Sequence, residues 1–184
     1  MKSKLFKTEG VVIRRMDLGE ADQIVTLLTP ELGKIHCIAK GCRKLTSKFC
    51  GRVELYYRLH VTGYWGRDFG YLKEVEVLDD TTFFDLSLAR HHALATVAEV
   101  THKLIQDEQN VEGVYPLLCE VSRSLKTGNR LQTELEMFLQ KLLSLLGFTL
   151  PTEKKPMAVL RTILNGPLKS ERFLAPVRLS PVRP

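Results

Sequence analysis

The first part of the chain alternates between apolar and polar positions in short runs separated by turn residues, a pattern that predicts strands. In the fourth run Leu55, Tyr57, Leu59 and Val61 share one face, as in a half-buried antiparallel strand. The five expected strands cover residues 9–15, 21–28, 33–39, 53–64 and 71–78. This spacing argues against βαβ units. It predicts a five-stranded antiparallel barrel, for which the oligonucleotide-binding (OB) fold is the leading candidate.

From about residue 84 the apolar positions recur every three or four residues instead, which predicts amphipathic helices. The acidic and hydroxyl residues 79–82 are suited to starting the first of them. We expect helices over about 84–106, from Val114 to Leu125, over 130–146, where Gly147 ends the helix, and over 158–164. The predicted fold class is therefore α+β. Residues 1–80 form an OB-fold nucleic-acid-binding domain, 81–175 an all-α C-terminal helical domain, and the proline-rich residues 176–184 a disordered tail.

Composition and charge narrow the functional classes. The chain has 184 residues, is 44% apolar and 26% charged, and carries a net charge of +6, which suits a partner bearing phosphates. It has no uncharged apolar run of about 18 residues, and its N-terminus lacks the apolar core of a signal peptide. We therefore expect a cytoplasmic, nucleoid-associated protein with no membrane partner.

Catalytic and metal-binding patterns are weak. The four cysteines form no C-x-x-C pair, so neither a thioredoxin-like site nor a zinc ribbon is indicated. Cys42 and Cys50 with a histidine match no common ligand spacing. A glycine-rich phosphate loop followed by Lys-Ser/Thr is also missing. We expect no enzyme activity, no cofactor and no metal site.

The densest charge lies between Lys34 and Arg58, where seven cations accompany one acid, Glu54. Such a density favours a polyanion, and aromatic residues among the cations offer faces on which bases stack. The alternative is a solvated surface that keeps a barrel edge from pairing. Arg14 and Arg15, which end the first strand, extend the same candidate groove. The residues expected to bind DNA are Arg14, Arg15, Lys34, Lys40, Arg43, Lys44, Lys48, Phe49, Arg52, Tyr56 and Arg58.

Several segments together resemble the bacterial RecO family of recombination mediators. Residues 17–34 resemble the family's N-terminal hairpin, and residues 39–44 and 47–54 resemble its basic loop. Residues 145–148, Leu-Leu-Gly-Phe, resemble the end of its long core helix, and 166–174 its last helical segment. None of these motifs is a catalytic signature. Their order and spacing carry the resemblance.

The resemblance implies an OB barrel joined to a helical domain and a protein that binds and anneals single- and double-stranded DNA. It further implies work with RecR, contact with the C-terminal tail of single-strand DNA-binding protein, and indirect help in loading RecA during repair. Many family members hold zinc with four cysteines between the core helix and the last helix. That interval, residues 149–157, has no cysteine here, so we predict no zinc.

A candidate groove for an acidic, hydrophobic peptide tail combines cations with an apolar residue near the C-terminus. An ordinary amphipathic helix is the alternative. The groove residues are Arg161, Lys169, Arg172 and Phe173.

The sequence thus predicts a non-enzymatic DNA-binding and strand-annealing protein. Two alternatives belong to other classes. An RNA-binding OB-fold module is one, because a basic barrel alone does not distinguish ribose from deoxyribose. The other is a protein-interaction adaptor whose basic loop contributes only to solubility.

Overall fold

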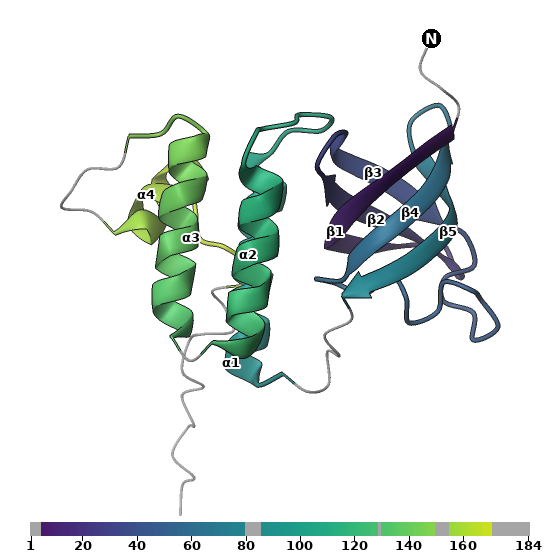
Figure 1. The fold of residues 1–184 in the computed structure, drawn as a ribbon, viewed down its shortest axis with the longest axis horizontal. Coiled ribbons are helices and arrows are strands. Elements are labelled where there is room, and N and C mark those ends of the chain that lie inside the picture. Colours follow the sequence, from purple (N-terminus) through teal and green to yellow (C-terminus); the bar gives the residue numbers. More distant parts are fainter. Residues whose placement is uncertain (1–4, 80–85, 129, 150–154, 171–184) are drawn as a thin grey trace, which may run out of the picture.

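The computed structural model describes residues 5–79, 86–128, 130–149 and 155–170, in which a five-stranded sheet is followed by helices (Figure 1). This confirms the prediction of an α+β chain with strands first and helices after them. The strands are β1 (Leu5–Leu18), β2 (Asp22–Thr29), β3 (Gly33–Ala39), β4 (Arg58–Trp65) and β5 (Gly70–Asp79). The helices of the described residues are α1 (Leu88–Leu104), α2 (Val114–Thr127), α3 (Leu131–Leu145) and α4 (Pro156–Ile163).

The five strands close into a barrel in the order β1-β2-β3-β5-β4. Four of the pairings are antiparallel, but β3 and β5 run parallel, with Cys37 opposite Gly70 and Ile38 opposite Tyr71. The all-antiparallel prediction is therefore wrong at this junction. β4 lies between β3 and β5 in the sequence and pairs with β1, so the chain reverses twice before β5 closes the barrel beside β3.

The fourth strand begins at Arg58, not at residue 53 as predicted. Residues 53–57 form turns, and Tyr56 has a φ of 68°, a left-handed conformation that no strand contains. Val53 and Tyr57 are buried with Phe49 in the core cluster inside the barrel. The apolar alternation of this segment thus reflects burial of Val53 and Tyr57 in the barrel core without an extended strand.

The helices follow their predicted apolar stripes, with corrected ends. Ser87 caps α1, since its hydroxyl accepts the N–H of Arg90. The expected cap at 79–82 is wrong for Asp79, which ends β5; residues 80–85 lie outside the described part of the chain. Gly147 follows α3 with a φ of 81°, as expected for a helix end. No helix within the described ranges is long and apolar enough to cross a membrane.

The helices lie together on one side of the barrel (Figure 1). One core cluster fills the barrel, and the other lies among the helices and includes Val11 and Ile13 of β1 and Leu28 of β2. These three side chains point out of the barrel, because their neighbours Val12 and Leu27 belong to the interior cluster. The helical part therefore covers the outer face of β1 and β2.

Polar contacts fix the segment after α1 to the barrel. The buried Lys34 ammonium lies 3.0 Å from Asp107 Oδ1 and donates to the His102 carbonyl oxygen at 3.0 Å. The Glu108 N–H donates to the Lys34 carbonyl oxygen at 2.8 Å, and Asn110 Nδ2 donates to the Pro30 carbonyl oxygen at 2.8 Å. We call this set of contacts the clasp. It holds residues 107–110 against the start of β3.

The last described residues are attached to α1 through Glu99. Its carboxylate accepts the backbone N–H groups of Lys169 and Ser170, each at 2.8 Å, and lies 3.0 Å from the Lys103 ammonium. Burial opposes ionisation of this carboxyl group, but these donors outweigh it and lower the Glu99 pKa to about 2. Of the segment 166–174 that resembles the family's last helical segment, Leu168 is buried; residues 171–174 and the expected tail 176–184 lie outside the described residues.

Glu99→Gln is expected to lower the free energy of unfolding at pH 7 by about 1–3 kcal/mol. A carboxyl group whose pKa is lower in the folded state stabilises fully above its unfolded pKa. That stabilisation is lost as the pH falls from about 4.5 toward 2. Urea unfolding of both proteins at several pH values should therefore show a difference that shrinks toward zero near pH 2. A difference that stays constant over this range would contradict the assignment.

Candidate nucleic-acid interface

Residues 40–52, which we call the cationic loop, follow β3 and are anchored to the barrel at the start of β2. The Gly41 N–H donates to Asp22 Oδ1 at 2.7 Å, and the Arg43 N–H donates to the Ala21 carbonyl oxygen at 3.0 Å. Cys42 and Phe49 are buried in the barrel core. Two buried side chains therefore fix a loop whose other positions are mostly exposed, and its cations face outward. The exposed cations are Lys40, Arg43, Lys44, Lys48 and Arg52.

Most of these charges are uncompensated. Arg43 lies 3.4 Å from Asp17, and Lys48 lies over the Phe49 ring. Within the described ranges, no ion pair involves Lys40, Lys44, Lys48 or Arg52. Exposed cations without counter-charges are free to contact phosphates. The loop thus groups five of the predicted DNA-binding residues on one anchored segment.

Two of the predicted residues do not fit a surface role. Lys34 is 6% exposed and its ammonium is already bound in the clasp, so it is a structural cation. Phe49 is 4% exposed because its ring belongs to the barrel core, so no base can stack on it. Burial argues against contact of these two side chains with DNA, and such contact stays a prediction. For Phe49 the exposed neighbour Lys48 misled the prediction, and Lys34 was grouped with the loop cations although its neighbours Gly33 and Ile35 are buried.

Arg14 and Arg15 bind other parts of the protein. Arg15 forms an ion pair with Glu54 and donates to Gln23 Oε1 at 2.9 Å. Arg14 is exposed and lies 2.7 Å from His102 Nε2. Burial, followed by the nearby charges of Lys34 and Arg14, lowers the His102 pKa to about 4, so this ring is neutral at pH 7 and accepts the hydrogen bond. A role for either arginine in DNA binding stays a prediction.

Tyr56 and Arg58 lie where the barrel meets the helices. Tyr56 packs partly buried against the helical core cluster, and burial raises its pKa to about 12. Arg58 is half-buried, and its charge acts on Tyr115 and Cys119 of α2. Neither side chain belongs to the surface formed by the cationic loop. Their contact with DNA also stays a prediction.

The sequence interpretation missed a pair of aromatic residues on the outer face of β4 and β5. Tyr64 and Tyr71 are opposite each other across the two strands, and their rings stack with centroids 5.1 Å apart. Lys40 lies over the Tyr71 ring, and Lys73 lies over the Tyr64 ring. Neither tyrosine is among the residues that the sequence predicted to bind DNA. The hairpin turn between Gly66 and Gly70 was the available signal, because it places Tyr64 opposite Tyr71.

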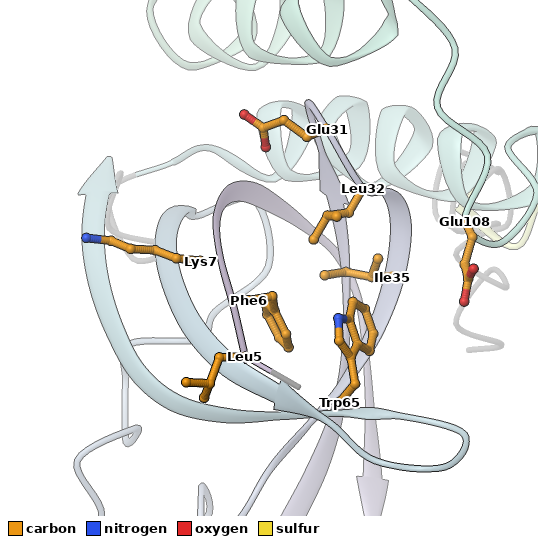
Figure 2. A pocket seen from close by; sticks show the side chains of 8 residues that line it. All are labelled: Leu5, Phe6, Lys7, Glu31, Leu32, Ile35, Trp65 and Glu108. Atoms are coloured by element: carbon orange, nitrogen blue, oxygen red, sulfur yellow. The ribbon is translucent and has the colours of Figure 1, made fainter. Parts of the chain in front are cut away.

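A pocket of about 610 Å³ opens at one end of the barrel (Figure 2). Its apolar lining includes the rings of Phe6 and Trp65, whose centroids are 4.7 Å apart. Two carboxylates, Glu31 and Glu108, and one ammonium, Lys7, also line it. More acid than base at the pocket disfavours a phosphate ligand. We therefore place the nucleic-acid interface on the cationic loop and not here.

The predicted peptide groove is not assembled by the described residues. Arg161 on α4 and Lys169 are both exposed, and Lys169 also lines a cavity between α1 and the barrel. Arg172 and Phe173 lie outside the described residues. A different groove, of about 670 Å³, runs between α2 and α3 and is lined by Leu117, Met137 and Leu145, among others.

The cysteines are poorly suited to metal binding. Cys37 is buried in the barrel, which raises its pKa to about 12, and burial also raises the Cys42 pKa. A thiol must lose its proton to bind zinc, so both are unfavourable ligands. Among the described residues, no group of three or more His, Cys, Asp or Glu side chains is placed to hold a metal ion.

Comparison with known proteins shows which family and which relatives this chain is similar to. Residues 1–80 match the family described as recombination protein O, N terminal. The DNA repair protein RecO of Roseiflexus sp. is 32% identical over 148 residues, which are 80% of this chain and 52% of that relative. The protein of the same name from Thermoanaerobacter sp. is 30% identical over 79% of this chain, and the one from Symbiobacterium thermophilum is 30% identical over 78% of it. The chain spans 59% and 57% of those two relatives, so it covers little more than half their length.

Proposed function

We propose that this chain binds DNA and anneals complementary strands in DNA repair and recombination. The proposal starts from the match of residues 1–80 to the family described as recombination protein O, N terminal, and from the similarity of the chain to DNA repair proteins RecO. The comparisons confirm the resemblance that the sequence motifs indicated. The name that these relatives share, DNA repair protein RecO, supports the repair role.

The barrel is the proposed DNA-binding part and has the OB fold. Its five strands, its closure through β1 and β4, and its parallel β3–β5 junction support this assignment. We propose residues 1–80 as this domain and 81–175 as a helical domain. The outward-facing apolar residues Val11, Ile13 and Leu28 join the two parts through a shared core.

The cationic loop is the single observation that carries the proposal. Four of its five exposed cations have no ion-pair partner among the described residues, and the anchored loop presents them together. Contact with phosphates releases the counterions condensed on DNA, which drives binding at low salt. Cations bound to two strands also screen the repulsion between them. Annealing then needs no bond to be made or broken, so the proposed protein is not an enzyme.

The helical domain is the proposed site for protein partners. The family resemblance suggests RecR and the C-terminal tail of single-strand DNA-binding protein, with loading of RecA as the result. Exposed apolar side chains support a partner on this part of the molecule: Met137 is 44% exposed, Leu145 42% and Phe148 40%. The groove between α2 and α3 lies beside two of them. Arg161 and Lys169 remain the proposed cations for the acidic tail.

A salt series tests the DNA-binding proposal. Five phosphate contacts on a single strand predict that log K falls against log salt with a slope of about −3.5. The measurement is the affinity for a labelled single-stranded oligonucleotide from low to physiological salt, with annealing of its complement followed in the same samples. A slope steeper than about −3 together with faster annealing is the expected result.

The opposing result is a nearly flat salt response with no acceleration of annealing. It would show that the barrel has the family's fold without its DNA-binding function. An RNA oligonucleotide of the same sequence serves as the comparison ligand. A marked preference for RNA would instead favour an RNA-binding role for the same loop.

A further inference from the structure

The stacked tyrosines on the outer face of β4 and β5 lie on a part of the barrel that the helices leave open. Helical contacts reach β1 through Val11 and Glu9, whose carboxylate lies 3.4 Å from the Tyr115 hydroxyl of α2. They reach the far ends of β4 and β5 through Arg58 and through Asp79, which lies 3.2 Å from the Lys126 ammonium. Tyr64 and Tyr71 are at the opposite end of these two strands. A strand of nucleic acid that lies on the barrel therefore has this end available.

The two rings stack face to face, which leaves the other face of each ring for a base once its lysine moves aside. Tyr64 and Tyr71 are direct cross-strand partners, their ring planes are 11° apart and their centroids are 5.1 Å apart. Their chain neighbours Gly63 and Leu72 are buried toward the barrel interior, so the tyrosines face outward. Each tyrosine is only partly buried. An aromatic pair serving the core alone would be covered by other side chains.

Two cations accompany the rings without counter-charges. Lys40 Nζ lies 5.3 Å from the Tyr71 centroid, and Lys73 Nζ lies 6.0 Å from the Tyr64 centroid. Both lysines are exposed, and no carboxylate of the described chain forms an ion pair with either. Their long stems let the ammonium groups swing from the ring faces to an incoming phosphate. Rings and cations together suit a ligand that is both aromatic and anionic.

Five other aromatic side chains of the described barrel do not offer this combination. Phe49 and Tyr57 are buried in the interior cluster, and Tyr56 is packed against the helices. Phe6 and Trp65 line the pocket that contains Glu31 and Glu108 (Figure 2). The tyrosine pair is thus distinguished by uncompensated positive charge.

Lys40 connects the pair to the cationic loop. Ile38 of β3 is opposite Tyr71 of β5, and Lys40 follows two residues later, where the loop begins. Phosphate-binding cations of the loop and the two rings therefore share one continuous stretch of surface. This continuity gives a path for a strand from the loop onto the outer face of β4 and β5.

We propose that Tyr64 and Tyr71 are a stacking platform for unpaired bases of single-stranded nucleic acid, with Lys40 and Lys73 contacting the adjacent phosphates. The proposal deepens the function proposed above and rests on it, because it assigns a second subsite to the same ligand. Stacking of a base on an aromatic side chain contributes about 1–3 kcal/mol and depends little on sequence. Bases inside a duplex are already stacked on each other. The platform therefore favours single strands and holds their bases exposed for pairing.

The test uses the variant Tyr64→Leu/Tyr71→Leu, which removes both rings and keeps the strands apolar. We expect its affinity for a single-stranded oligonucleotide to fall about tenfold or more. Its affinity for duplex DNA should change less than about twofold, and its salt slope should stay that of the unmodified protein, because no cation is removed. The matched control is Tyr64→Phe/Tyr71→Phe, which keeps both rings and should bind within about twofold of the unmodified protein.

An abasic oligonucleotide provides a second control, since it keeps the phosphates and lacks the bases. The unmodified protein should bind it about as weakly as the leucine variant binds the ordinary oligonucleotide. DNA and RNA of matched sequence should lose affinity equally in the leucine variant, and their relative affinities for the unmodified protein identify the preferred nucleic acid. Far-UV circular dichroism and the urea midpoint verify that each variant is folded.

Three outcomes overturn the proposal. Unchanged single-strand affinity in the folded leucine variant would show that the rings do not stack on bases. Equal losses for single strands and duplex with a shallower salt slope would show that the tyrosines only position the lysines. If the unmodified protein binds no nucleic acid with a salt-dependent affinity, the proposed function itself fails and the platform fails with it. The salt series on the unmodified protein distinguishes this last case from the first two.

Discussion

Replacing Lys40, Arg43, Lys44 and Lys48 together by alanine is expected to weaken DNA binding more than tenfold at low salt and to leave the fold intact. These four side chains are exposed, and only Arg43 has an ion-pair partner among the described residues, at 3.4 Å from Asp17. Loss of four phosphate contacts should make the slope of log K against log salt shallower by about 2.8 for a single strand. Fluorescence anisotropy with a labelled oligonucleotide across a salt series measures both quantities.

The matched control removes the same charge elsewhere. Arg123, Arg130, Lys141 and Lys155 are exposed cations of the helical part, and their replacement by alanine lowers the net charge of the chain by the same four units. If the loop is the phosphate-binding surface, this control keeps most of the affinity and of the salt slope. Equal losses in the two variants would mean that the overall charge of the protein, and not this loop, attracts DNA.

Gly33→Ala is expected to lower the free energy of unfolding by about 3 kcal/mol or more. Gly33 has a φ of 67°, which costs a residue with a Cβ atom about 1–2 kcal/mol. An added Cβ would also lie 2.2 Å from the Gln109 carbonyl oxygen. Because this neighbour is backbone, residues 107–110 must move away, and the clasp contact between Lys34 and Asp107 is weakened with them. Urea unfolding followed by far-UV circular dichroism measures the loss.

Gly41→Ala is the matched control for this change. Gly41 has the same φ of 67°, but an added Cβ meets nothing within 4 Å. It should therefore lose only the conformational part, about 1–2 kcal/mol. The difference between the two variants reports the contact between the start of β3 and the segment after α1. Similar losses in both would show that this contact contributes little to stability.

The sequence by itself determined which segments are strands and which are helices. Short runs rich in Val, Ile, Leu or Tyr and bounded by turn residues over β2, β3 and β5, and apolar spacing of three and four over α1 and α3, are local signals because each belongs to a single element. The cluster of cations between Lys40 and Arg52 could also be recognised from the sequence alone. Cations that are clustered in the sequence are also clustered on the surface when their segment folds as an anchored surface loop.

Predictions from local patterns failed where a residue packs against or binds a part of the chain that is distant in sequence. Residues 53–57 alternate like a strand, yet they form no strand, because Val53 and Tyr57 reach the barrel core from a turn and leave the same apolar pattern as burial in a sheet. Lys34 sits in a basic region, but a carboxylate 73 positions later, Asp107, holds it in the clasp. No local pattern records such a partner.

Tertiary structure alone decided which cations face solvent and which aromatic residues lie among them. Val11, Ile13 and Leu28 bring the helices onto one side of the barrel and so leave the Tyr64 end of β4 and β5 open. Barrel closure places Tyr71 beside Tyr64 and next to Lys40, three residues that come from three different strands or their ends. The sequence specifies how each element buries its own apolar face. Which residues form the interface depends on how those elements cover each other, because exposure is a property of the assembled surface and not of any single segment.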